Sequence, residues 1–135
     1  MDTIASEALA RKAQADAALE RAAIQLRALL RDAARALRPF PPFPGAFFTN
    51  AVEVDLTGVG RPDLGCVVVG EDGGLYELQM KINFDEELAD LVDPVQARDE
   101  EMKKLDDLHP RDEVVLAYNA ITQLTELLLE RAEGA

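Results

Sequence analysis

The chain has 135 residues, 14 basic and 26 acidic side chains and a formal net charge of −12, which fits one ordinary domain with a strongly negative surface. Such a protein repels nucleic-acid phosphates and anionic membranes, so we expect neither as a partner and expect a protein with a basic surface instead. One cysteine, no run of about 18 apolar residues and no signal-like N-terminus predict a cytoplasmic protein without disulfides.

Residues 3–38 predict one long helix, because they contain neither glycine nor proline and stop at Pro39. Apolar residues recur there with alternating spacings of four and three, which is typical of a helix that packs along a seam against another helix. The seam expected to mediate self-association consists of Leu19, Ala22, Leu26, Leu29 and Ala33. It combines two seven-residue series, one of Ala8, Ala15, Ala22, Leu29 and Ala36 and one of Leu19, Leu26 and Ala33, and it is widened by Ala23, Leu30 and Leu37. At about 54 Å this helix would overhang a compact domain, so we expect its apolar stripe to contact a second copy.

The same helix carries a basic ridge of Arg27, Arg31 and Arg35, spaced four residues apart. Residues 1–38 hold seven basic and five acidic side chains, whereas residues 39–135 hold seven basic and twenty-one acidic ones. Like charges at this spacing repel one another, so acidic groups are expected to offset the ridge. Those groups belong either to residues 85–107 of the same chain or to a neighbouring subunit.

Residues 39–50 form a connector whose Pro/Phe-rich part, PFPPFPGAFF, cannot be helical and favours an extended path. Phe40 and Phe43 are the candidate interaction residues of this segment. One interpretation is that its phenylalanines cover the apolar face of a sheet. The other is that the rigid segment docks in a groove of a partner.

Three strands are expected next, at residues 51–56, 64–69 and 75–82, with a hairpin turn at Glu71–Gly74. Their alternation predicts an antiparallel meander with one apolar face. The inward residues are expected to be Val52, Val54, Leu56, Tyr76, Leu78, Met80 and Ile82.

An acidic turn at 85–93 and two helices, over about 94–107 and from Pro110 to about Glu133, complete the chain. The inward stripe of the last helix is expected to include Val114, Ala117, Tyr118, Ile121, Leu124 and Leu128, widened by Leu116, Leu127 and Leu129. The predicted fold is therefore a single α+β domain of order α-β-β-β-α-α. Residues 1–38 are its association element and residues 51–135 its core.

Few residues suit catalysis. His109 is the sole histidine and precedes Pro110, which favours a capping role, and Cys66 lies in an apolar strand without a basic neighbour. The acids between Asp85 and Asp93 lack the spacing of a calcium loop, and no phosphate-binding glycine motif is present. We therefore expect no catalytic, cofactor-binding or metal site. If the protein were an enzyme, the polar groups to inspect would be Glu53, Asp55, Glu77 and Lys81.

The sequence thus predicts a non-catalytic accessory subunit or adaptor, which forms a homo-oligomer through its first helix and binds a basic partner protein. An alternative is a small acidic inhibitor or chaperone that masks a basic surface on one target. These two differ in salt dependence, because charge masking weakens with ionic strength and an apolar helix seam does not.

Overall fold

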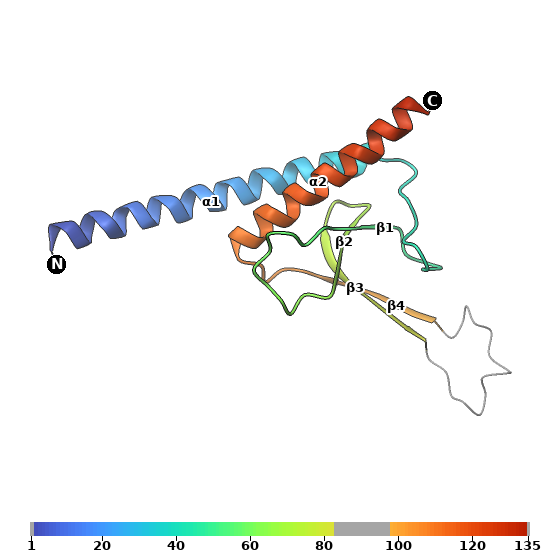
Figure 1. Ribbon diagram of the computed structural model, residues 1–135, viewed down its shortest axis with the longest axis horizontal. Helices are drawn as coiled ribbons and strands as arrows, with labels where there is room; N and C mark the ends of the chain where they lie inside the picture. Colours follow the sequence, from blue (N-terminus) through green and yellow to red (C-terminus); the bar gives the residue numbers. More distant parts are fainter. Residues whose placement is uncertain (1, 83–97, 135) are drawn as a thin grey trace.

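The computed structural model describes residues 2–82 and 98–134 of the chain. Within these residues, two helices lie over one face of a four-stranded antiparallel sheet, and the first helix projects far beyond the sheet at its N-terminal end (Figure 1). This architecture confirms the predicted α+β class, with one strand more than expected.

Helix α1 (Thr3–Ala36) is capped at its N-terminus by Asp2, whose carboxylate accepts a hydrogen bond of 3.2 Å from the backbone N–H of Ile4. Its 34 residues correspond to about 51 Å at 1.5 Å per residue. The long helix expected from the sequence is therefore confirmed, and it does extend past the rest of the domain (Figure 1).

The sheet contains β1 (Ala51–Glu53), β2 (Cys66–Gly70), β3 (Leu75–Ile82) and β4 (Arg98–Lys104), which lie side by side in that order. Each neighbouring pair is antiparallel, so the three predicted strands do form a meander. The turn between β2 and β3 contains Gly73 at φ +81°, which agrees with the hairpin that the sequence predicts there.

The predicted helix over 94–107 is wrong for residues 98–104, which form β4. Seven residue pairs join β4 to β3, from Tyr76 opposite Lys104 to Ile82 opposite Arg98. Backbone hydrogen bonds to an existing strand therefore override the helical pattern of the side chains. The acidic turn at 85–93 and the start of the predicted helix lie outside the described residues.

The main core lies between the helices and the sheet. Val67 and Val69 of β2 point into it, together with Leu30 of α1. Other buried members are Ala34, Leu37, Phe40, Val54, Leu75, Leu116, Ala117, Ala120 and Leu124. Val68 alternates with its neighbours and therefore faces the opposite side of the sheet.

That opposite face has its own small cluster, in which Val68 packs with Ala51 and Leu78. Tyr76 and Met102 pack against this cluster, so Tyr76 and Leu78 of β3 lie on the face away from the helices. The expectation that Tyr76 and Leu78 face the helix-covered core is therefore wrong. The sheet has two apolar faces, and the helices cover only one of them.

Helix α2 (Pro110–Glu133) begins and ends as the sequence predicts, with His109 before it and Gly134 after it. Its fully buried side chains include Leu116, Ala117, Ala120 and Leu124. Tyr118, expected to point inward, is instead exposed. The buried stripe is thus rotated slightly from the predicted one.

Candidate protein-interaction surfaces

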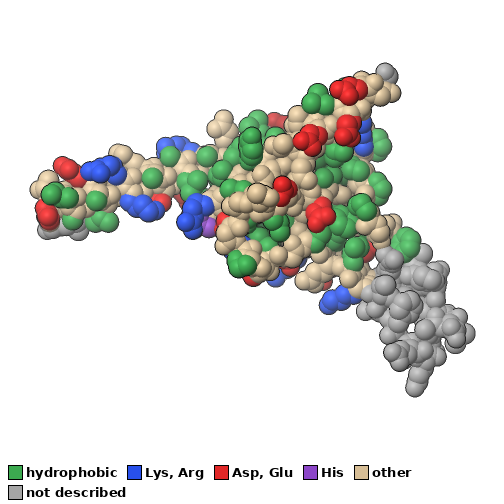
Figure 2. Space-filling model, in the orientation of Figure 1, with side chains coloured by type: hydrophobic (Ala, Val, Ile, Leu, Met, Phe, Trp, Pro, Cys, Tyr) green, Lys and Arg blue, Asp and Glu red, His purple; other side chains and the backbone are tan. Residues whose placement is uncertain are grey.

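Residues 3–16 of α1 form an N-terminal arm in which every side chain is exposed. Ile4 is 74% exposed and Leu9 57%, and Figure 2 shows the arm standing clear of the rest of the molecule. Glu7 and Arg11 approach to 4.0 Å along the helix, and Lys12 pairs with Asp16 in the same way. These pairs and the many alanines favour helix in the arm, but no residue between 2 and 82 or between 98 and 134 covers its apolar side chains.

The predicted seam residues are divided between the inside and the outside of the domain. Leu26 and Ala33 pack against the main core of their own chain, whereas Leu29 remains 48% exposed. Leu19 and Ala22 are half-buried. The residues of α1 and its C-terminal end that are most deeply buried are Ala23, Leu30, Ala34 and Leu37.

The seven-residue series identified in the sequence therefore forms the outer edge of a wide apolar stripe. Ala8, Ala15, Leu29 and Ala36 are exposed, and Ala22 is half-buried. The inner edge of the stripe packs into the core of the same chain. The outer edge extends from Ala8 to Ala36, about 42 Å at 1.5 Å per residue, and is largely uncovered by the described residues.

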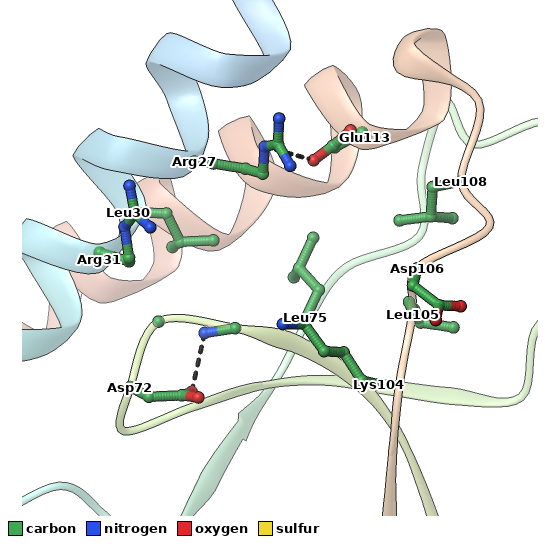
Figure 3. A pocket seen from close by; sticks show the side chains of 12 residues that line it. Arg27, Leu30, Arg31, Asp72, Leu75, Lys104, Leu105, Asp106, Leu108 and Glu113 are labelled. Carbon is green, nitrogen blue, oxygen red and sulfur yellow. Dashed lines mark hydrogen bonds and ion pairs between the residues drawn. The ribbon is translucent and has the colours of Figure 1, made fainter.

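The basic ridge is neutralised within the chain at one of its three positions. The guanidinium Nε of Arg27 lies 2.8 Å from a carboxylate oxygen of Glu113 on α2 (Figure 3). Arg31 and Arg35 form no ion pair with any described residue. Just past the helix, Arg38 donates a hydrogen bond of 3.1 Å to the carbonyl oxygen of Glu71.

The Pro/Phe connector wraps around the β1 edge of the sheet. Phe40 is buried in the main core, whereas Phe43 packs against the cluster on the opposite face. This placement agrees with the interpretation that the connector covers the sheet. Phe47 and Phe48, which the sequence analysis did not single out as site residues, are 52% and 66% exposed. Their rings meet edge to face, with centroids 6.4 Å apart.

The backbone that carries this aromatic pair is held by one carboxylate, Glu100 of β4. It accepts hydrogen bonds from the N–H groups of Phe47 (2.7 Å) and Phe48 (3.0 Å) and from the hydroxyl of Thr49 (2.7 Å). Burial raises the pKa of the Glu100 carboxyl, but these donors outweigh it and hold the pKa below its usual range. No pattern in the sequence indicates this contact, because its partners are more than 50 residues apart.

The residues weighed as catalytic candidates have local structural roles. The Nδ1 of His109 accepts a hydrogen bond of 3.1 Å from the N–H of Arg111, which confirms the capping interpretation. Burial raises the pKa of the Cys66 thiol, and the nearby charges of Glu53 and Glu77 raise it further, which disfavours a reactive thiolate. Asp55 accepts hydrogen bonds from both the N–H and the hydroxyl of Thr57.

Comparisons of the chain with models of protein families, with curated proteins and with solved structures found no match. In the part of the chain that the structure describes, no helix is both long and apolar enough to cross a membrane. Those same ranges contain no group of three or more His, Cys, Asp or Glu side chains arranged to hold a metal ion.

Proposed function

We propose that the protein is a non-catalytic assembly protein, an accessory subunit or adaptor, which self-associates through α1 and binds a basic partner protein. The observation that supports this proposal is the uncovered outer edge of the α1 stripe, from Ala8 to Ala36. Apolar residues repeated every seven positions are typical of helices that pack against one another. A second copy of α1 supplies the same pattern, so pairing of two copies covers both stripes.

The charge distribution supports a basic partner for the rest of the molecule. Residues 39–135 carry a net charge of −14, the difference between seven basic and twenty-one acidic side chains. Acidic side chains are visible over the C-terminal half of α2 in Figure 2, where Glu126, Glu130 and Glu133 are all exposed. Such a surface speeds association with a basic protein and disfavours acidic ones.

The self-association is tested by light scattering coupled to gel filtration at micromolar concentrations. Ala15→Glu places a charge on the outer edge at an exposed position, so it should reduce the oligomer to a monomer without unfolding the chain. Ala10→Glu is the matched control, because Ala10 is also exposed on the arm but lies on the opposite side of the helix. A monomeric wild-type protein, or equal behaviour of the two variants, would contradict the proposal.

A second candidate function is an inhibitor or chaperone that masks a basic surface, and the exposed pair Phe47 and Phe48 favours it. Aromatic side chains on a fixed backbone bind with little loss of conformational entropy and often dominate interface energies. Here the acidic surface would steer the partner and the two rings would anchor it. Steep loss of the association rate between low and high salt would support this function, whereas a salt-independent rate would support assembly through α1.

A further inference from the structure

A pocket of about 550 Å³ opens between α1, the β2–β3 turn, the end of β4 and the start of α2. This size falls within the range of about 300–1,000 Å³ that is usual for small-molecule sites. Its floor consists of four leucines, two of them buried and two half-buried: Leu30, Leu75, Leu105 and Leu108. None of the predicted seam residues lines it, whereas Arg27 and Arg31 of the basic ridge do.

Three cationic side chains stand at the rim of this pocket. Arg27 is engaged by Glu113, as described above, but Arg31 and Lys104 form no ion pair with a described carboxylate. Figure 3 shows Lys104 reaching from β4 toward the β2–β3 turn, so that its amine lies beside Leu75. Among the described residues neither cation is held in an ion pair, although Lys104 lies near enough to Asp72 to lower the pKa of its carboxyl.

Most carboxylates at the rim already have partners within the chain. Glu113 holds Arg27, and Asp72 accepts hydrogen bonds from the N–H of Gly74 (2.9 Å) and the hydroxyl of Tyr76 (2.6 Å). Burial raises the pKa of the Asp72 carboxyl, but the hydrogen bonds and the nearby charge of Lys104 bring it below its usual value. Asp106 remains, and Figure 3 shows its carboxylate beside Leu105, on the side of the pocket away from Arg31.

The part of α1 that carries Arg31 packs closely against the β2–β3 turn. A Cβ atom added to Gly73 would lie 2.5 Å from the Cα of Arg31, so the turn and the helix backbone are in direct contact. The distance between the turn and α1 is thereby set by backbone atoms. A ligand consequently meets a preformed site and has little ordering entropy to overcome.

We propose that this pocket binds a carboxylate attached to an apolar group, with Arg31 and Lys104 holding the carboxylate and the leucine floor covering the hydrocarbon. Arginine pairs with carboxylates through two parallel hydrogen bonds, and both cations lie at the edge of apolar surface. The same chemistry occurs in a free aliphatic acid and in a peptide that ends in an apolar residue with a free C-terminus. The protein's net charge of −12 disfavours anions in general, so anion binding must arise from this local arrangement.

The first test is a titration of the full ¹⁵N-labelled chain with octanoate, followed by chemical shifts of the backbone amides. We expect saturable shifts at Gly73, Gly74 and Leu105, which line the pocket. Octylammonium has the same hydrocarbon and the opposite charge, so it should produce at most weak shifts there. Equal shifts with both probes, or no saturation with any anionic probe, would overturn the proposal.

A second probe separates the two sources of the ligand. Acetyl-leucyl-leucine with a free carboxylate is compared with its C-terminal amide and with octanoate. Tighter binding of the free peptide identifies a peptide C-terminus as the ligand, and tighter binding of octanoate identifies a free aliphatic acid. Equal binding of the peptide acid and its amide would contradict the role of the cations.

Substitutions at the rim test the assignment of the residues. Arg31→Gln should weaken octanoate binding about threefold, as expected for a solvent-exposed ion pair, and the double variant with Lys104→Gln by roughly tenfold. Arg21→Gln is the matched control, since Arg21 is an exposed arginine of the same helix that does not line the pocket. Unfolding curves establish that the variants remain folded, and equal affinities of the Arg31 and Arg21 variants would refute the assignment.

Discussion

Gly73 occupies a position where the fold leaves no room for a methyl group. A Cβ atom there would lie 2.5 Å from the Cα of Arg31 and 3.0 Å from its backbone nitrogen. Carbon atoms pack at roughly 3.5–4.0 Å, so α1 would have to retreat from the turn by about 1 Å. Gly73 also has φ +81°, a conformation that L-residues with a side chain rarely adopt.

These two effects give the magnitude expected for Gly73→Ala. The left-handed backbone conformation costs an alanine about 1–2 kcal/mol, and overpacking against a rigid neighbour costs about 1–3 kcal/mol more. We therefore expect the free energy of unfolding to fall by about 2–5 kcal/mol. Gly45→Ala is the matched control, because Gly45 has φ +87° but a Cβ atom there would meet nothing within 4 Å. Only the backbone cost of about 1–2 kcal/mol applies to it.

The assay is urea unfolding followed by circular dichroism at 222 nm, with both variants compared to the wild type under the same conditions. The slope of the free energy with urea should stay constant if the unfolded state is unchanged. The difference between the two variants then measures the contact between the turn and α1. If Gly73→Ala is no more destabilising than Gly45→Ala, the close approach of turn and helix carries no energy and the reasoning fails.

Three further predictions concern single side chains. Glu100→Gln should lower stability by less than about 1 kcal/mol, since the site is near solvent. Because the pKa of Glu100 is lowered in the folded state, the stabilisation by its carboxylate is complete above about pH 4.3 and is lost as pH falls through the folded-state pKa. Between pH 6 and pH 3, the free energy of unfolding of the variant should therefore fall less than that of the wild type. The hydrogen bond to Asp72 and burial raise the pKa of Tyr76 to about 12. In a Tyr118→Phe variant, which leaves Tyr76 as the one tyrosine, absorbance at 295 nm should report that pKa. Ionisation of Tyr76 near pH 10 in the folded chain would disprove the contact. Leu30→Ala should cost about 2–5 kcal/mol in urea unfolding, against little for the exposed Ile24→Ala, and equal losses would contradict the assignment of Leu30 to the core.

The sequence predicted α1, β2, β3 and α2 well, because each has a strong periodic pattern and clear boundaries. It missed β4, where six of the seven residues in RDEEMKK are charged and Met102 is the exception. Such a segment has no apolar face of its own, and its strand structure comes from pairing with β3. Lysine and acidic residues on an edge strand also discourage pairing with other chains.

A weak signal for β4 was nevertheless present in its charges. In the observed register, Lys103 lies opposite Glu77 and Asp99 lies opposite Lys81. Opposite charges at directly facing positions of antiparallel strands are favourable. The pattern becomes meaningful only once the register is known, which explains why sequence reasoning overlooked it.

The prediction of the face on which the apolar side chains of β3 lie was wrong for a related reason. Its alternation separates Tyr76, Leu78 and Met80 from Glu77 and Gln79, and the apolar set was assigned to the helix side. However, β2 is apolar on both faces, so it does not indicate which of them the helices cover. The helices meet β3 at Leu75, while Figure 1 shows the β3–β4 ribbon continuing away from them. Polar residues can therefore occupy the helix-side face beyond the helices.

The same ambiguity divides the candidate interaction residues into two groups. A wide apolar stripe on a helix can be covered from either edge, and periodicity alone does not say which edge the chain's own core takes. In this fold the core takes the edge that contains Leu30 and Ala34, and it leaves Ala15 and Leu29 outside. Whichever edge the core uses, a stripe too wide for one contact keeps a second apolar edge. That remaining edge, extended by the N-terminal arm, is the physical basis for proposing that a second copy of α1 covers it.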